Sequence, residues 1–521
     1  MANSYLQALN LPAAWAAQNA WRILDTDWQD GAQFLACQNA WQHDPLRPRM
    51  LHYVGVVDAS SANSSPGLHR LSFNAGQVLL TLCVGDLNSM LRAQDFWADS
   101  IFLRQQKCSV WDDWAIQALM RCCRRGTQLA SRDVNVDLLK QLTEHGFEIQ
   151  ADAVPEHVQA RFNPRWQIKS TRRQAQWPIV QPSSCVVIGA GLAGASTAAS
   201  LARRGWQVQV LDAAASPATA ASGLPVGLMA PPFVGGQGAR SHLLNLGVRL
   251  TLQQAHGHLK SGQDWVPSGI MTTQPGLAAR WEPNSAWIKP QRLVQAWLAR
   301  PGVQFRSNAQ VASMNCIDDE WTLRDSQNTV LAKAGLVVLA CAGGIDALLA
   351  GSGMGLRQPL ERIHGQVSWA LQQESDQTSL PPFPLNGFGH LVPDVPLDGG
   401  PAWFAGATYA LGHAMPTAAQ GHESNLSRLA QLHPPSAGVM AQRIVDGSIR
   451  AWQGTRYTTR DRMPVVGRLN TSAQPALCIN SGFGSRGLSW SVLCAELLAA
   501  QIGNEPLPMP HAWAKLMRGT R

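Results

Sequence analysis

Apolar and polar residues form an ordered series of short blocks in the middle of the chain. An apolar run at Val186–Ile188 enters a glycine-rich turn, a helix of small residues reaches about Arg204, and an alternating strand spans Trp206–Leu211. A strand, a helix and a second strand in this order make a βαβ unit, which pairs two parallel strands. The pattern therefore predicts a parallel sheet of the dinucleotide-binding type in this half of the chain.

Residues 1–150 show a separate alternation of helical and strand-like patterns. We expect helices at Ala13–Ile23, Gly31–Trp41 and Asp112–Arg124. We expect strands at Leu51–Val57, Val78–Val84 and Ser100–Leu103. This alternation is typical of an α/β domain, and Pro164–Pro182, rich in Gln, Ser, Arg and Pro, is the expected linker.

Strand-like runs punctuated by Trp and Pro return after the βαβ unit, between about Leu224 and Pro290 and again from Val367 to Tyr409. They predict an antiparallel sheet inserted into the second α/β domain. The longest apolar run, Ala334–Gly351, is broken by glycines and by Asp346. It therefore indicates a buried strand and a loop, not a membrane span.

Length and charge narrow the class of protein. A chain of 521 residues is too long for one hydrophobic core, so at least two domains are expected. The net charge of +8 suggests an anionic partner, although many basic proteins bind no nucleic acid. The charge clusters at Arg121–Arg125 and at Arg161–Arg173. The second cluster is either a solvated linker or a track for phosphate groups.

The cysteines give no sign of a metal site. None of the 10 cysteines forms a CxxC pair, and no signal sequence is recognised. We expect reduced thiols in a cytoplasmic protein, without a metal, a membrane segment or a protein partner.

The main candidate chemistry lies in the glycine-rich turn, at Gly189, Gly191 and Gly194, and at Asp212 after the second strand. Glycines at this spacing permit a tight turn, let backbone N–H groups approach a pyrophosphate, and allow close packing of helix on strand. An acid at the position of Asp212 takes a ribose hydroxyl. Strand, helix and acid together predict a dinucleotide site.

Three later segments favour a flavin over a nicotinamide. Leu336–Gly344 is a buried strand that leads into a turn of small residues, and Gly454–Gly467 gathers arginines and an acid around a proline turn. Gly482–Gly487 opens the apolar helix Leu488–Ile502, whose N–H groups and dipole could face the flavin pyrimidine carbonyl. Each segment alone could equally be a structural turn. Their order after a βαβ unit supports the flavin interpretation.

Specific motifs in this half resemble the FAD-dependent oxidoreductases of the D-amino acid oxidase and glycine oxidase type. More closely, they resemble the oxidoreductase half of the bifunctional tRNA 5-methylaminomethyl-2-thiouridine biosynthesis (MnmC) family. The motifs are Ala221–Gly223, Gly227–Pro231, Gly365–Val367, Gly406–Tyr409, Thr459–Gly467 and Gly484–Leu488. The resemblance implies bound FAD, with contacts from Gly189, Gly191, Gly194, Asp212, Ser222, Gly223, Gly484 and Gly487.

The resemblance also implies a substrate, the modified wobble uridine of tRNA. The family reaction removes the carboxymethyl group of 5-carboxymethylaminomethyl-(2-thio)uridine by oxidation and leaves 5-aminomethyl-(2-thio)uridine and glyoxylate. Arg456 is the candidate carboxylate clamp, because a planar guanidinium fits a carboxylate bidentately. An ion pair with Asp461 is the structural alternative for Arg456. Arg486 is a candidate at the flavin edge, and His364 stands where the family often has arginine, with Arg362 nearby.

The resemblance extends to the N-terminal half, where the family has a methyltransferase. Its E-x-GFGxGxNFL loop, which holds S-adenosylmethionine, corresponds to Asp25–Leu35, and Asp27 and Gln29 replace two of its glycines. Val57 replaces the ribose-binding acid, and the FLDGFAP motif becomes Phe102–Lys107. Gly85–Asp86 and Trp114 remain recognisable. Because the new side chains crowd the cofactor path, S-adenosylmethionine binding and methyl transfer are expected to be lost.

The expected organisation has three parts. Residues 1–160 are a degenerate methyltransferase-like domain, 161–182 a basic linker, and 183–521 the oxidoreductase domain, with a substrate subdomain inserted at approximately 224–290 and 365–455. Two other functions stay open. A free amino-acid oxidase acting on glycine or a D-amino acid leaves the N-terminal domain idle. A flavin-bearing tRNA-binding module without catalysis is disfavoured by the complete phosphate loop with Arg456.

Overall fold

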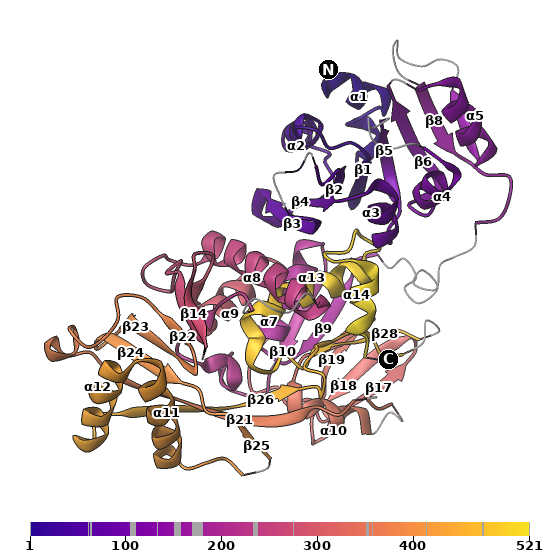
Figure 1. Cartoon of the computed structure of the whole chain (residues 1–521). Helices are drawn as coiled ribbons and strands as arrows, with labels where there is room; N and C mark the ends of the chain where they lie inside the picture. The colour runs from indigo at the N-terminus through magenta and orange to yellow at the C-terminus, as the bar shows by residue number, and fades with distance from the viewer. Residues whose placement is uncertain are drawn as a thin grey trace. The chain divides into compact units, whose positions relative to one another are not determined.

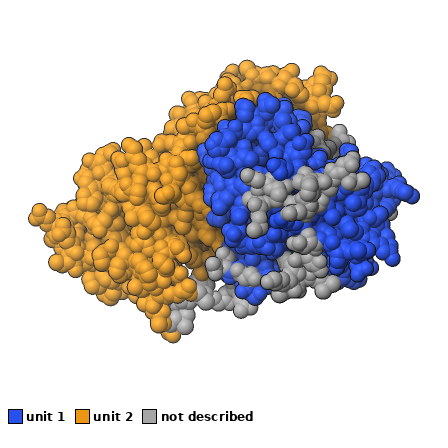
Figure 2. Space-filling view, turned by 90° about the horizontal axis from the view of Figure 1, so that it is seen from above, with its two compact units in different colours: residues 1–183, 203–206, 496–516 blue, residues 184–202, 207–495, 517–521 orange. Residues whose placement is uncertain are grey.

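The structure is a computed structural model that describes residues 2–60, 62, 65–104, 111–132, 134–150, 158–168, 181–232, 238–274, 276–350, 354–356, 358–412, 414–470 and 474–519. The chain forms two compact units, shown in different colours in Figure 2. Unit 1 comprises Met1–Ser183, Arg203–Trp206 and Glu496–Leu516. Unit 2 comprises Ser184–Ala202, Gln207–Ala495 and Met517–Arg521.

Unit 1 is built on an eight-stranded sheet with the strand order β3-β4-β2-β1-β5-β6-β8-β7 (Figure 1). The strands are β1 (Ala20–Asp25), β2 (Met50–Val57), β3 (Gly67–Phe73), β4 (Val78–Val84), β5 (Ala98–Leu103), β6 (Cys123–Ser131), β7 (Phe147–Gln150) and β8 (Val158–Phe162). The helices are α1 (Ala2–Ala8), α2 (Ala32–His43), α3 (Leu87–Ala93), α4 (Asp113–Met120) and α5 (Val136–Glu144). The five strands from β4 to β6 pair in parallel.

The burial of the central strands agrees with their parallel pairing. Every residue of β2 is buried, as expected of a strand covered on both faces by helices. Two apolar clusters cover the two faces, one containing Trp15 and Trp41 and the other Phe96 and Ile116. The sequence pattern thus predicted the α/β class of this half correctly.

One element prediction in unit 1 was wrong, and one helix was predicted too long. The helix expected at Ala13–Ile23 is a single 3-10 turn at Ala13–Trp15 followed by strand β1, in which Trp21 and Ile23 enter the core. The helix expected at Asp112–Arg124 ends at Met120, because Cys123 already belongs to β6. A short apolar run fits the period of a helix and that of a strand equally well, and pairing with neighbouring strands decides which of the two forms.

Unit 2 contains a six-stranded sheet with the order β16-β10-β9-β20-β28-β27. Its strands are β9 (Ser184–Ile188), β10 (Gln207–Leu211), β16 (Val303–Arg306), β20 (Leu336–Leu339), β27 (Val465–Arg468) and β28 (Ala476–Ser481). Helix α7 (Leu192–Arg203) connects β9 to β10, and β9 is parallel to both β10 and β20. This confirms the predicted βαβ unit.

A second large sheet in unit 2 has the order β14-β13-β22-β23-β24-β21-β25, and β26 pairs with β21 (Figure 1). Its strands are β13 (Ile270–Gln274), β14 (Leu277–Glu282), β21 (Glu361–Leu371), β22 (Leu385–Gly387), β23 (Gly389–Leu397), β24 (Gly400–Gly406), β25 (Ala410–Leu411) and β26 (Arg450–Thr458). Helices α11 (Ala418–Leu432) and α12 (Pro434–Val445) contribute to a core with this sheet. The sheet is mainly antiparallel, as predicted, with one parallel pairing between β13 and β22.

The region between Leu224 and Pro290 is not made of strands alone, which corrects the prediction. It contains the 20-residue helix α8 (Ala239–His258). The buried residues of α8 include the pair Leu243–Leu244 and the run Leu246–Val248, which only the exposed Asn245 separates. They therefore form no narrow stripe, and the helical period is hard to recognise in the sequence.

Further elements of unit 2 complete the fold. They are β11 (Gly227–Met229), β12 (Trp265–Val266), β15 (Ala286–Ile288), β17 (Ser313–Ile317), β18 (Glu320–Arg324), β19 (Val330–Ala334), α9 (Pro290–Leu298) and α10 (Ile345–Ala350). Helix α13 (Gly487–Ile502) begins in unit 2 and ends in unit 1, which also holds α14 (His511–Leu516). In the described part of the chain, no helix has the length and apolar character needed to cross a membrane.

Candidate functional site

The glycine-rich turn lies between β9 and α7, at the carboxyl end of the central strand. Gly189 has a φ of +108°, and a Cβ there would lie 2.7 Å from the carbonyl oxygen of Ala340. A Cβ on Gly194 would overlap the carbonyl oxygen of Gly189. A Cβ on Gly191 would meet only the side chain of Ser222, with Oγ at 3.0 Å. Gly189 and Gly194 are therefore needed for close contact between backbone segments. Gly191 is the least enclosed of the three glycines.

Asp212 and Ser222 adjoin this turn. The Asp212 carboxylate accepts hydrogen bonds from the backbone N–H of Ala190 at 2.6 Å and of Ala214 at 2.8 Å. Ser222 Oγ accepts the backbone N–H of Leu192, the first residue of α7, at 3.0 Å. Gly223 follows Ser222 in the 3-10 turn Ala221–Gly223. The predicted residues of this region thus come together at one end of the sheet.

The start of α13 lies beside the start of α7. Gly484 has a φ of +55°, and a Cβ on Gly487 would lie 3.2 Å from the Leu192 side chain. Ser196 donates to the carbonyl oxygen of Ser491 at 3.0 Å, which ties the two helices together. Two helix N-termini and a glycine turn thus lie close together at one sheet edge, an arrangement that suits an anionic dinucleotide.

Arg456 joins the antiparallel sheet to the loop before α13. Its Nη1 donates to Ser485 Oγ at 2.9 Å and its Nη2 to the carbonyl oxygen of Thr408 at 3.0 Å. Gly365 leaves the space for it, because a Cβ there would overlap Nη2. Burial lowers the pKa of Arg456, and the nearby Tyr409 opposes this shift. A part-buried guanidinium of this kind is suited to an anion.

Asp461, the alternative ion-pair partner considered for Arg456, makes hydrogen bonds within the turn Thr459–Met463. Its Oδ1 accepts hydrogen bonds from Thr459 Oγ1 at 2.8 Å and from the Met463 N–H at 3.0 Å. Arg456 donates its hydrogen bonds to Ser485 and Thr408, which lie on other segments of the chain.

His364 and Arg362 take different places on β21. The buried ring of His364 makes hydrogen bonds with Thr455 Oγ1 at 2.9 Å and with the carbonyl oxygen of Gly412 at 3.1 Å. Arg362 is exposed. His364 therefore connects β21 to β26 and to the segment after β25, which is a structural task.

His390 on β23 is a residue that the sequence analysis missed. It pairs with Gly406 across the sheet, close to the segment that Arg456 contacts. Burial first, and the charge of Arg456 second, lower its pKa to about 4. A neutral imidazole can accept a hydrogen bond from an amine. A lone histidine in a strand gives no sequence signal for this role.

The lowered pKa of His390 predicts a pH dependence of stability. In the unfolded chain a histidine binds its proton at about 6.5, whereas folded His390 binds it at about 4. In this window the unfolded state holds more protons, so this contribution to stability is complete above pH ~6.5 and falls as the pH is lowered, by up to about 1.4 kcal/mol per unit. Thermal unfolding at pH ~7.5 and ~5 should show a larger loss for the wild type than for His390→Asn. An equal loss of stability in the wild type and in His390→Asn would contradict this prediction. The control variant is His43→Asn, at an exposed histidine.

In unit 1, Trp28 fills the loop that follows β1. A Cβ on Gly31 or Gly55 would lie 2.7 or 2.5 Å from its ring, and the ring packs against Phe34 and Tyr53 at centroid distances of 5.8 and 6.1 Å. Asp25 accepts a hydrogen bond from the Tyr53 hydroxyl at 2.6 Å, and burial raises its pKa to about 6. The Trp28 indole thus packs on Tyr53, whose hydroxyl in turn bonds the buried carboxyl group of Asp25.

The residues that the sequence singled out in this loop behave differently. Gln29 is exposed, and its amide donates to Asp27 Oδ2 at 2.9 Å. Val57 is buried at the end of β2. Gln105–Lys107, and Lys169, Arg172 and Arg173 of the basic segment, lie outside the described residues.

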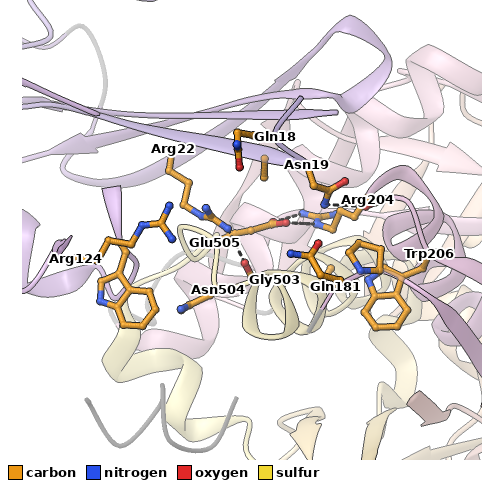
Figure 3. A pocket seen from close by; sticks show the side chains of 14 residues that line it. Gln18, Asn19, Arg22, Arg124, Gln181, Arg204, Trp206, Gly503, Asn504 and Glu505 are labelled. Carbon is orange, nitrogen blue, oxygen red and sulfur yellow. Dashed lines mark hydrogen bonds and ion pairs between the residues drawn. The ribbon is translucent and has the colours of Figure 1, made fainter. Parts of the chain in front are cut away.

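Unit 1 also contains a pocket of about 140 Å³ near the amino end of β1 (Figure 3). Its charged side chains are matched within the protein. Arg22 lies 3.3 Å from Asp99, which also binds Arg124, and Arg204 lies 2.8 Å from Glu505. Since these cations already have carboxylate partners, we assign no ligand to the pocket. Across the described residues, no three His, Cys, Asp or Glu side chains gather into a metal site.

Comparison with known proteins is consistent with both halves. Residues 184–258 and 249–501 match the family of FAD dependent oxidoreductases, and residues 54–156 match an S-adenosyl-L-methionine-dependent methyltransferase family. The chain is 44% identical to the tRNA 5-methylaminomethyl-2-thiouridine biosynthesis bifunctional protein MnmC of Albidiferax ferrireducens, over 99% of this chain and 95% of that protein. Its identity to the protein of the same name from a Polaromonas species is 39%, over 99% and 93% of the two chains.

Solved structures agree on the fold of unit 2. Glycine oxidase from Geobacillus kaustophilus matches with a TM-score of 0.51 and 18% identity, over 65% of this chain and 98% of that one. Iminodiacetate oxidase from a Chelativorans species matches with a TM-score of 0.51 and 20% identity, over 64% and 99%. Together with the family matches, they confirm the predicted fold class.

Proposed function

The chain belongs to the family of FAD-dependent, bifunctional tRNA 5-methylaminomethyl-2-thiouridine biosynthesis proteins, and we propose that its oxidoreductase half modifies the wobble uridine of tRNA. The reaction that we propose is the oxidative removal of the carboxymethyl group of 5-carboxymethylaminomethyl-(2-thio)uridine. The products are 5-aminomethyl-(2-thio)uridine and glyoxylate. The observation that carries the proposal is Arg456, which stands between the antiparallel sheet and the loop before α13.

FAD is the cofactor that the family implies, and the residues of unit 2 fit it. Gly189, Gly191 and Gly194 keep side chains away from the turn that would hold the pyrophosphate. We assign the adenosine ribose to Asp212, whose two oxygens each keep a lone pair beyond their backbone bonds. Ser222 and Gly487 lie beside Leu192 at the start of α7, and Gly223 and Gly484 lie in the two 3-10 turns that contain or adjoin them. When bound, FAD supplies the two-electron acceptor for a substrate C–H bond.

Arg456 binds the substrate carboxylate in this proposal. One hydrogen bond from each of its Nη atoms is used within the protein, so further N–H donors remain for a carboxylate fork. The neutral ring of His390 accepts the N–H of the substrate's secondary amine. The C–H bond next to the carboxylate is broken as its hydride passes to the two-electron acceptor, the amine N–H proton is released to water, and a C=N bond forms. Water then hydrolyses this imine to the primary amine and glyoxylate.

The test is the nucleoside content of modified tRNA after incubation with the purified protein. Mass spectrometry should show 5-carboxymethylaminomethyl-(2-thio)uridine converted to the 5-aminomethyl form, with one glyoxylate released for each. The rate should fall steeply with salt, because each phosphate contact releases counterions, whereas oxidation of free glycine should be slow and nearly independent of salt. Efficient oxidation of glycine with unchanged tRNA would instead establish a free amino-acid oxidase.

We further propose that the N-terminal half no longer uses S-adenosylmethionine. Trp28 occupies the space above Gly31 and Gly55, and a buried carboxyl group lies at the strand end. Titration calorimetry should detect no binding at micromolar concentrations. Trp28→Ala is the matched variant, since binding gained only by this variant would identify the indole as the obstacle. Micromolar binding by the wild type, or methylation of aminomethyl-tRNA, would contradict the proposal.

A further inference from the structure

Three arginines lie along the border of the proposed flavin site, on three different segments. Arg486 ends the turn Gly484–Arg486, and its Nη1 donates to the carbonyl oxygen of Ala230 at 3.4 Å. Arg240 lies in the first turn of α8, on the chain that continues from Ala230. Arg462 lies in the turn between β26 and β27, with a φ of +60°.

Local contacts bring these segments together. Thr458, at the end of β26, forms an isolated bridge with Phe483, and a Cβ on Gly484 would lie 3.1 Å from Thr458 Oγ1. The turn that carries Arg462 therefore begins beside the loop that carries Arg486. Burial lowers the pKa of Arg486, and Arg240 lowers it further. Burial and Arg462 do the same to the pKa of Arg240, in agreement with the contacts that bring the three segments together.

These charges are not balanced by carboxylates. Among the residues that the structure describes, none of the three arginines forms an ion pair with an acid. The only acid of the turn Thr459–Met463 is Asp461, whose Oδ1 holds Thr459 and Met463. Residues 233–237, which precede α8, contain no acidic side chain. Grouped cations repel one another, and an external anion that binds between them relieves this repulsion.

The three groups also differ in exposure. Arg486 is half-buried beside the site, whereas Arg240 and Arg462 are exposed. The three arginines thus extend from the border of the proposed flavin site to the protein surface. A single carboxylate needs one guanidinium, and Arg456 already serves it in the proposed function. A row of cations instead suits an anion with repeated charges.

We propose that Arg240, Arg462 and Arg486 bind the phosphodiester groups that flank the nucleotide whose base enters the flavin site. This rests on the proposed function, because it takes RNA as the substrate. Each guanidinium can hold a phosphate with two parallel hydrogen bonds. The clamp fixes the backbone of the RNA while Arg456 holds the reacting carboxylate, so the two anions of one substrate are bound by separate arginines.

The test measures binding of an unmodified anticodon stem-loop by fluorescence anisotropy, using the full-length, FAD-loaded protein. Arg240→Gln and Arg462→Gln should each weaken binding about tenfold and reduce the slope of log affinity against log salt by ~0.7. Arg460→Gln removes the same charge from the same turn and serves as the matched control, with less than about a threefold effect expected. Circular dichroism and the unfolding temperature show whether each variant is folded, and FAD absorbance shows whether it retains the cofactor.

The outcomes separate this inference from the proposed function. Oxidation of modified tRNA by the wild type, with unchanged stem-loop affinity in Arg240→Gln and Arg462→Gln, would overturn the clamp and leave the function standing. Weakened stem-loop binding in both variants, with no oxidation of modified tRNA by the wild type, would support the clamp and refute the function. Loss of FAD from these variants would assign the arginines to the cofactor and overturn the clamp.

Discussion

Replacing Gly194 by alanine is expected to abolish FAD binding and to destabilise unit 2. The new Cβ would overlap the carbonyl oxygen of Gly189, which is backbone and cannot rotate away. Helix α7 would have to move off β9, and its N-terminus would leave the pyrophosphate position. Overpacking against a fixed neighbour costs about 1–3 kcal/mol or more. The readout is flavin absorbance per protein after purification, together with the unfolding temperature.

Two other glycines make the experiment specific. Gly257 lies in α8 with nothing within 4 Å of its ideal Cβ, so Gly257→Ala should stabilise the protein by about 0.5–1 kcal/mol. Gly191→Ala presses only on the movable Ser222 side chain and should weaken FAD binding less than Gly194→Ala. A Gly194→Ala protein that retains full flavin would show that α7 does not hold the cofactor.

The fold of the central βαβ unit could be predicted because its signals are local. The glycine spacing, the small residues of α7 and the alternating β10 all lie within one short stretch. Strand β1 and helix α8 could not be predicted in the same way. The stretch Ala20–Asp25 becomes strand β1 because it pairs in parallel with β2 and β5. Helix α8 is buried around most of its circumference, so its apolar residues do not mark one face.

The contacts that define the site join distant parts of the chain. Arg456 was recognised by its motif, but its bonds to Ser485 and Thr408 and the gap at Gly365 depend on the folded sheet. His390 gave no signal at all. In the N-terminal half, sequence reasoning attributed the crowding to Asp27 and Gln29, whereas the side chain that fills the loop is Trp28.

Unit 1 also includes the segment Glu496–Leu516 from near the end of the chain. No local sequence pattern predicts this. Arg204 is almost fully buried and forms ion pairs with Glu496 and Glu505 at 3.0 and 2.8 Å. Although burial acts in the opposite direction, the charge of Arg204 holds the pKa of Glu505 well below its usual range. Arg70 donates to the carbonyl oxygen of Pro506 at 2.6 Å. The segment Glu496–Leu516 is therefore anchored in unit 1 by buried charges.

Arg456→Ala is expected to lower kcat/KM by about a thousandfold for modified tRNA and for small amino-acid substrates alike. Both carry the carboxylate that this guanidinium binds in the proposed function, and a thousandfold loss corresponds to ~4 kcal/mol of transition-state stabilisation. Arg456→Lys should recover only part of the activity, because an ammonium is a point charge and does not reproduce the planar fork.

Gly365→Ala tests the same geometry without touching the charge. Its new Cβ would overlap Nη2 of Arg456 and lie 3.0 Å from the carbonyl oxygen of Thr408, so the guanidinium must leave its position. We expect KM to rise for both substrates while FAD stays bound. Ser485→Ala, which removes one hydrogen-bond acceptor and leaves the carboxylate fork intact, should cost less than about tenfold. If Arg456→Ala and Gly365→Ala both keep wild-type KM values, the carboxylate is held elsewhere, because neither the charge nor its position would then matter to substrate binding.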